Sequence, residues 1–120
     1  MDDSQELTLV RKAFALARGA SGYVEWCDDR AVAVAREKLA DLNGLTPEAV
    51  RTRAIDYVND GGAIIPVVET RPEWSDFRYY YKVILPVEDF PRGVFVETRL
   101  IDEDPNDPVV HIVSAHRQGV

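Results

Sequence analysis

The feature that most constrains the fold is a change of periodicity at the glycine pair Gly61-Gly62. Before this pair, apolar residues recur every three or four positions, the spacing that gives an α-helix one apolar face. After it come short runs rich in β-branched and aromatic residues, which are typical of strands. A chain of 120 residues suits one domain. We therefore expect a single α+β domain over 1–120, with a helical part at about 3–60 and a sheet part at about 63–116.

Three segments of the helical part are expected to form helices. The first, Asp3–Arg18, carries an apolar stripe and is ended by glycine. The second runs from about Asp28 to Leu42 and is ended by Asn43-Gly44. The third begins with Thr46 as N-cap and Pro47 at the first helical position, and ends near residue 60. The linker between the first two supplies core residues, namely Tyr23, Val24 and Trp26.

The sheet part is expected to form an antiparallel sheet of about four strands. Proline in the first strand removes a hydrogen-bond donor, so this strand belongs at an edge or is bent. In the second strand alternate residues, starting at Tyr79, make the expected core face. The expected strands are Ala63–Glu69, Arg78–Leu85, Gly93–Ile101 and Val109–Ala115.

The last two strands hold both histidines, and a regular register separates them. If Ile101 pairs with Val109, Arg99 lies opposite His111 on one face. Leu100, Thr98, Val96 and Val94 then lie opposite Val110, Ile112, Ser114 and His116 on the core face. This register makes His116 a candidate general acid or base at the rim of the core, with Ser114 as its hydroxyl neighbour. It also prevents the two histidines from sharing a metal ion.

The acidic connector between these strands, residues 102–108, begins like a calcium-binding loop but does not continue as one. The sixth position of such a loop requires glycine and is Asp107, and the twelfth requires glutamate and is Val113. A polar turn is the better interpretation. We expect no metal site and no cofactor.

A second candidate site is the stretch Glu69–Tyr81, which mixes arginines with aromatic residues. This combination clamps bases and phosphates, and it also forms binding hot spots in protein interfaces. Trp74, Arg78 and Tyr80 are the candidate binding residues. Cys27 stands beside Trp26 and two aspartates, which raise a thiol pKa, so it is not expected to act as a nucleophile.

Composition narrows the function class. The net charge of −7 disfavours nucleic-acid binding as a general property of the surface. A single cysteine, an acidic start and the absence of a long apolar run favour a cytoplasmic protein. No P-loop, GxGxxG, GxSxG or paired CxxC motif is present in the sequence.

Three stretches are similar to the small bacterial nuclease superfamily that includes RelE-type and MqsR-type toxins (the barnase–EndoU–colicin–RelE group). They are the helix ending in YVNDGG, the segment FRYYYKVILP, and the hairpin FVETRLI…VVHIVSAH. The resemblance covers roughly Leu45–His116. It implies metal-independent ribonuclease activity of a toxin–antitoxin type, with RNA as partner. It implies acid–base and phosphate-stabilising roles for His116, Lys82 and Arg71, and stacking for Tyr80.

Three further interpretations stay open beside this resemblance. Members that cleave RNA are usually basic, whereas this chain is acidic. An inactive relative, or a non-catalytic partner-binding protein of immunity or regulatory type using Trp74–Tyr81, fits that charge. A homodimer paired through the edge strand Ala63–Glu69 is a third reading.

Overall fold

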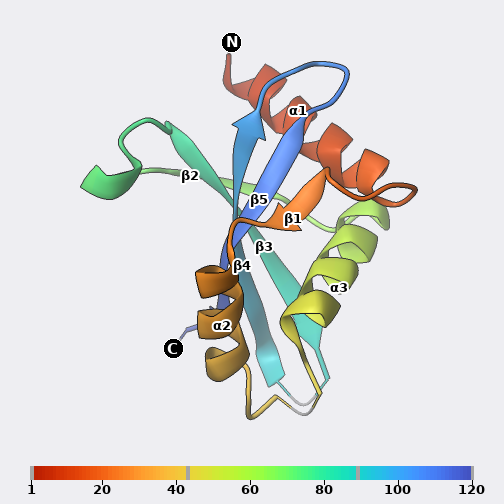
Figure 1. Cartoon of the computed structure of the whole chain (residues 1–120), viewed down its shortest axis with the longest axis vertical. Coiled ribbons are helices and arrows are strands. Elements are labelled where there is room, and N and C mark those ends of the chain that lie inside the picture. The colour runs from red at the N-terminus through yellow and green to blue at the C-terminus, as the bar shows by residue number, and fades with distance from the viewer. Residues whose placement is uncertain (1, 43, 89, 120) are drawn as a thin grey trace.

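The computed structural model of the chain describes residues 2–42, 44–88 and 90–119 (Figure 1). In these residues three α-helices, one 3-10 turn and five strands follow one another along the chain. They are α1 (Asp3–Ala17), β1 (Val24–Trp26), α2 (Asp29–Lys38), α3 (Pro47–Asn59), β2 (Ile65–Val68), η1 (Pro72–Trp74), β3 (Tyr79–Val87), β4 (Phe90–Asp102) and β5 (Val109–Arg117).

The strands form one sheet in the order β1-β5-β4-β3-β2. The expected α+β class, with helices packed on a mostly antiparallel sheet, is confirmed. The fifth strand was not expected: β1 comes from the linker and pairs in parallel with β5. The Val110 N–H donates to the Tyr23 carbonyl at 2.8 Å, and the Cys27 N–H donates to the Ile112 carbonyl at 3.0 Å. A three-residue strand is too short to show a periodicity of its own.

The helix starts follow the capping signals. Asp2 accepts from the Gln5 N–H, Asp28 from the Ala31 N–H, and Thr46 from the Ala49 N–H. Helix α2 ends at Lys38, earlier than expected, because the chain turns there through short-range bonds. The Leu42 N–H donates to the Leu39 carbonyl at 2.9 Å. Asn43, expected to end this helix, lies outside the described residues.

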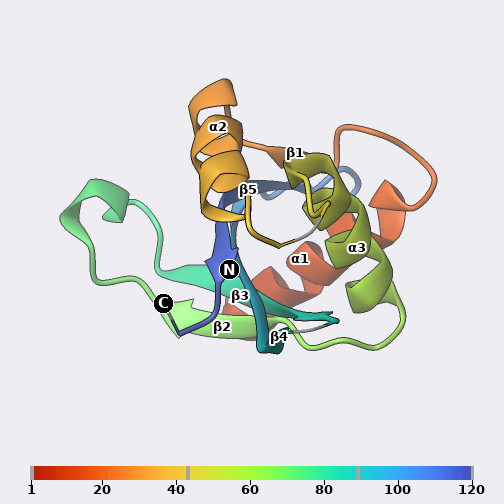
Figure 2. The same ribbon diagram turned by 90° about the horizontal axis from the view of Figure 1, so that it is seen from below.

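The core lies between the helices and one face of the sheet. Figure 2 shows α1 and α3 on the same side of the sheet. Helix α1 contributes Val10 and Phe14, neither of which is exposed to solvent. The strands contribute alternate side chains, and the expected inward set of β3 is confirmed, with Tyr79 at its margin. The buried strand residues on this core face are Val24, Tyr81, Val83, Leu85, Val94, Val96, Thr98, Leu100, Val110, Ile112 and Ala115.

Strand β2 is an edge strand, as its proline predicts. The Glu69 N–H donates to the Arg78 carbonyl at 2.9 Å, next to the β2–β3 ladder. Because hydrogen-bonding directions alternate along a strand, the backbone of Pro66 and Val68 faces away from β3. The missing N–H of Pro66 therefore costs the sheet no hydrogen bond.

The register of β4 and β5 agrees with the expected one only in its first half. Arg99 lies opposite His111, Leu100 opposite Val110, and Thr98 opposite Ile112. A bulge at Val113 then shifts the pairing, so that Ser114 lies opposite Glu97 and His116 opposite Phe95. A second irregularity places Val109 opposite Asp102 instead of Ile101.

The expectation that Ser114 and His116 share the core face is therefore wrong. The extra residue reverses the alternation, and Ala115 takes the buried position instead. Both histidines consequently lie on the face of the sheet away from the core, and the expectation that they lie on opposite faces is also wrong. Their separation along β5 remains, because His111 lies opposite Arg99 and His116 opposite Phe95.

Candidate functional site

The face of the sheet opposite the helical core carries a row of aromatic rings. We call this the open face and define it by the half-buried residues Tyr80, Lys82, Phe95, Ser114 and His116. The Tyr80 and Phe95 ring centroids lie 6.5 Å apart, and the Phe95 and His116 centroids lie 4.9 Å apart with the rings 12° from parallel. Strands β3, β4 and β5 thus present three rings side by side. Such a row can stack against planar groups.

His116 is held in one orientation by its own backbone neighbour. Its Nδ1 lies 3.0 Å from the Arg117 carbonyl oxygen, which can only accept a hydrogen bond. Nδ1 therefore carries the proton, and in the neutral ring Nε2 is the basic nitrogen. A neutral imidazole with a fixed tautomer is the form that a general base requires.

Two cations border the aromatic row. The Lys82 Nζ lies 6.0 Å from the Phe95 ring centroid, and the Arg71 Cζ lies 5.2 Å from the Tyr80 centroid. Lys82 forms no ion pair with any residue in the described part of the chain. It is thus the cation of this face whose charge remains uncompensated.

Beside the row lies a cluster of two glutamates and two arginines, all of them buried except the partly exposed Arg71. We call it the ion-pair cluster: Glu69, Arg71, Glu97 and Arg99. Arg71 contacts Glu69 through Nε at 3.0 Å and Glu97 through Nη2 at 2.7 Å. Arg99 contacts both carboxylates through Nη2, with Glu97 at 2.8 Å. The charges of the cluster cancel, so it adds no net negative charge to the open face.

Arg99 is the centre of this cluster and is completely buried, with 0% of its side chain exposed. The Trp74 ring covers its guanidinium, with Cζ 3.9 Å from the ring centroid. Phe77 and Tyr80 lie at 5.2 and 5.7 Å. Its Nε and Nη1 are buried without a hydrogen-bond partner in the described residues, so aromatic faces supply part of their surroundings. The segment 69–78, the arm, is thereby fixed to β4.

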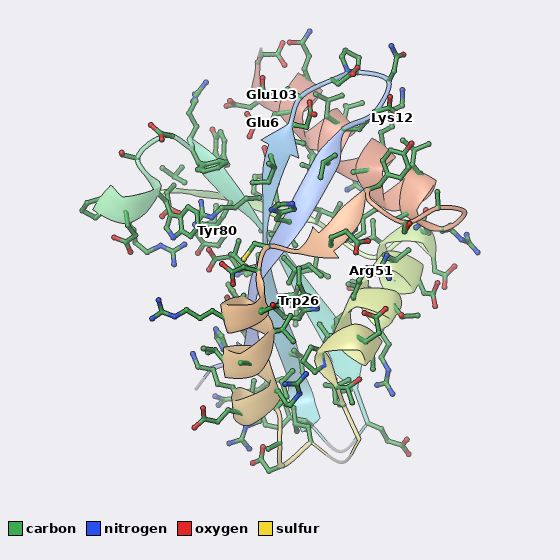
Figure 3. The ribbon with its side chains drawn as sticks, in the orientation of Figure 1. Glu6, Lys12, Trp26, Arg51, Tyr80 and Glu103 are labelled. Atoms are coloured by element: carbon green, nitrogen blue, oxygen red, sulfur yellow. The ribbon has the colours of Figure 1, made fainter. Side chains whose placement is uncertain are left out.

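The arm projects beyond the sheet in Figure 1, with η1 at its tip. The ion-pair cluster tethers its first residues, since Glu69 and Arg71 both belong to it. Tyr80, labelled in Figure 3, lies where the returning chain enters β3. The arm and the open face therefore meet at Tyr80 and Arg71.

Acid should weaken the cluster. Hydrogen bonds from Arg71, and then from Arg99, hold the pKa of Glu69 at about 2, below its ordinary value of 4.5. Because the folded-state pKa is the lower one, this carboxylate stabilises the fold fully above pH 4.5 and progressively less as pH falls towards 2. We expect the free energy of unfolding, measured with urea at pH 7, 4.5, 3.5 and 2.5, to fall over this window.

Glu69→Gln should make this acid dependence shallower, because the substituted residue no longer titrates. Glu103→Gln is the matched control: Glu103 is exposed and forms no ion pair with a described residue, so it should leave the slope unchanged. Equal slopes in wild type and Glu69→Gln would contradict this assignment.

The candidate residues from the sequence are brought together only in part. His116, Ser114, Lys82 and Tyr80 share the open face, and Arg71 borders it. Arg71 is largely occupied by its two glutamates. Arg78 lies elsewhere, pairing with Asp3 at 3.2 Å and lying over Tyr79. Trp74 is engaged with Arg99.

Phe95, Glu97 and Arg99 were missed as site residues. They form an alternating set within β4, and this alternation places them on one face, where Glu97 and Arg99 are expected from the sequence as a solvated polar cluster with His111. No local pattern distinguishes that face from an ordinary solvated one, because Glu97 and Arg99 appear in the sequence as polar surface residues and are buried only once the arm covers them.

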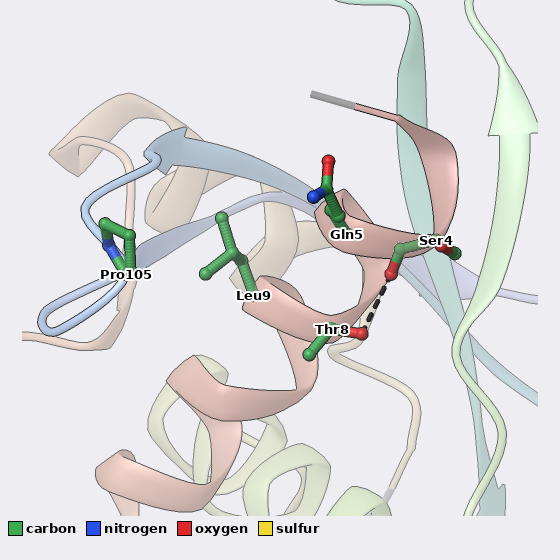
Figure 4. Close-up of a pocket in the computed structure, with 5 residues that line it drawn as sticks. All are labelled: Ser4, Gln5, Thr8, Leu9 and Pro105. Atoms are coloured by element: carbon green, nitrogen blue, oxygen red, sulfur yellow. Dashed lines mark hydrogen bonds between the residues drawn. The ribbon is translucent and has the colours of Figure 1, made fainter.

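Three other features of the molecule are less suited to a catalytic site: a hollow beside α1, the acidic connector and Cys27. A hollow of about 390 Å³ lies between α1 and the acidic connector (Figure 4), and it is lined by side chains without acid–base groups: Ser4, Gln5, Thr8, Leu9 and Pro105. The connector itself is a turn, in which the Asp104 N–H donates to Asp102 and the Asn106 N–H to Asp104. Burial raises the pKa of the Cys27 thiol, as expected.

Within residues 2–42, 44–88 and 90–119, no group of three or more histidine, cysteine, aspartate or glutamate side chains is placed to hold a metal ion. None of the helices in these residues combines the length and apolar character needed to cross a membrane. Comparison with known protein families, curated proteins and solved structures finds no match for this chain.

Proposed function

We propose that the open face binds single-stranded RNA and that His116 acts there as the general base of metal-independent cleavage. The observation that carries this proposal is the aromatic row Tyr80–Phe95–His116 with Lys82 beside it. Unpaired bases stack on such rows, and a nearby ammonium group attracts the phosphate backbone. The resemblance to RelE-type and MqsR-type nucleases points to the same strands.

The overall charge of −7 does not oppose binding at this particular face. The two glutamates next to the aromatic row are neutralised within the ion-pair cluster. Many of the remaining carboxylates belong to the helices and the acidic connector, such as Asp29, Glu48 and Asp104. The open face therefore keeps a local positive charge from Lys82.

The fixed tautomer of His116 supports the catalytic half of the proposal. Its basic nitrogen is the one not bound to the Arg117 carbonyl, on a side chain that is only half-buried. In metal-independent cleavage this nitrogen would take the proton of a ribose 2′-hydroxyl as that oxygen attacks the adjacent phosphorus. The P–O5′ bond breaks, a 2′,3′-cyclic phosphate forms, and the departing 5′-oxygen takes a proton from solvent water. Lys82 would then offset the negative charge that develops on the phosphate.

The test is RNA binding and cleavage by the full chain, using a fluorescein-labelled single-stranded oligoribonucleotide. Phe95→Leu keeps an apolar side chain but removes the ring, and we expect it to weaken binding by about tenfold, since one stacked base is worth about 1–3 kcal/mol. His116→Ala should lower the cleavage rate by about 10²-fold or more. Lys82→Ala should reduce the slope of log K against log salt by about 0.7.

Arg78→Ala is the matched control, because Arg78 lies immediately before β3 and is not part of the open face. It should leave both binding and cleavage unchanged. Binding that is equal in wild type and Phe95→Leu would overturn the assignment of the face. Binding without any cleavage by the wild type would overturn the role of His116 alone.

Partner binding through Trp74–Tyr81 is a second candidate, and one observation favours it. Trp74, Phe77 and Tyr80 remain half-buried at the surface although they pack around Arg99. Tyr81 is excluded from such a role because it is 1% exposed and donates its hydroxyl to Glu6. Co-purification of a partner that is lost with Trp74→Ala would support this candidate over RNA binding.

A further inference from the structure

A groove of about 420 Å³ lies at the end of the sheet where β3 begins and β4 ends. It is built by parts of the chain that are distant in sequence: α1, the arm, the end of β4 and the acidic connector. Glu6 and Glu103 come from two of these parts and are labelled near the same end of the molecule in Figure 3. None of the residues that define the open face lines this groove.

The groove contains exposed apolar surface. Ile101 follows the last core residue of β4 and is 44% exposed. Phe77, from the arm, lines the same groove and is half-buried. An aliphatic and an aromatic side chain together offer an anchor for an apolar side chain of a partner.

The rim of the groove is acidic and uncompensated. Glu6, Asp76 and Glu103 line it, and none of the three forms an ion pair with a described residue. The groove's arginine, Arg78, is already paired with Asp3 at 3.2 Å. The connector extends the negative charge beyond the groove through exposed residues, among them Asp102 and Asp104.

We infer that this groove docks a basic, amphipathic segment of a protein partner. Charge complementarity favours lysine or arginine side chains, and the apolar surface of Ile101 and Phe77 favours an apolar residue between them. The extension of the acidic surface along the connector fits a chain segment that continues past the groove. This inference is independent of RNA binding, because it uses none of the residues that define the open face.

The experiment measures binding of a fluorescein-labelled peptide, KRLFRK, to the full chain by fluorescence anisotropy at about 0.15 M salt. Glu103→Lys reverses a rim charge, and we expect it to weaken binding by about five- to tenfold. Ile101→Ser removes the apolar anchor and should weaken binding by about threefold or more.

Helix α2 offers a matched control for each variant. Glu37→Lys makes the same change of charge at an exposed site, and Val34→Ser removes an apolar side chain of similar exposure, 41%. Both should change the affinity by less than about twofold. Equal losses in the groove variants and these controls would overturn the proposal, as would an absence of peptide binding. RNA binding should be unaffected by Glu103→Lys, which separates this test from that of the open face.

Discussion

Replacement of Arg99 by alanine is expected to destabilise the protein by about 3–5 kcal/mol, because it breaks a buried ionic network from its centre. Glu69 and Glu97, with side chains 2% and 8% exposed, would each lose one of their two arginine partners. Trp74 would lose the guanidinium beneath its ring. The free energy of unfolding from urea denaturation, with circular dichroism as the signal, measures this loss.

Two variants make this prediction specific. Arg78→Ala removes an ion pair in which the arginine is 69% exposed, and should cost less than about 1 kcal/mol. The double variant Arg99→Met/Glu97→Met replaces two buried charges with apolar side chains and should recover part of the lost stability, because Glu97 is then absent and Glu69 keeps its ion pair with Arg71. A loss of less than about 1 kcal/mol in Arg99→Ala would show that the cluster contributes little.

Gly93→Ala is expected to destabilise the protein by about 2–4 kcal/mol through the backbone of β4. Gly93 has a φ of +75°, which alanine adopts only with strain, and a Cβ there would lie 2.4 Å from the Leu85 carbonyl oxygen. The β3–β4 ladder must therefore shift close to Phe95. Chemical denaturation measures the stability, and RNA binding by the same variant reports on the open face.

Gly22→Ala tests the effect of backbone strain alone, without the steric clash that a Cβ makes at Gly93. Gly22 also has a positive φ, +96°, but a Cβ there has nothing within 4 Å. It should therefore cost only the conformational strain, about 1–2 kcal/mol. If the two variants were equally destabilised, the close approach to Leu85 would have no energetic consequence.

Local signals were sufficient to predict most of the secondary structure. The capping residues Asp28 and Thr46 begin helices because their side chains bond the first free N–H groups, which requires only nearby sequence. Pro66 marked an edge strand because a missing N–H is tolerated there. Strand β1 was not predictable in the same way, since its pairing with β5 joins residues far apart in the chain.

The position of His116 was predicted on the wrong face because a regular strand was assumed. The sequence of β5 does carry a signal for the bulge. The polar residues Ser114 and His116 flank Ala115, and this order breaks the alternation set by Val110 and Ile112. A bulge restores burial of the small apolar residue, and this gain outweighs the disruption of the ladder. The choice between a bulge and a polar core position depends on what packs against the strand.

The sequence by itself determined the α+β class, the helix starts, the edge strand and the alternation of β3, because these depend on neighbouring residues and on the period of the apolar pattern. Only the tertiary structure decided that both histidines lie on the open face. It also decided that Glu97 and Arg99 are buried, since the arm must fold over them before Trp74 covers the guanidinium. Burial and ion pairing across such distances depend on which segments meet in space, and local patterns do not encode that.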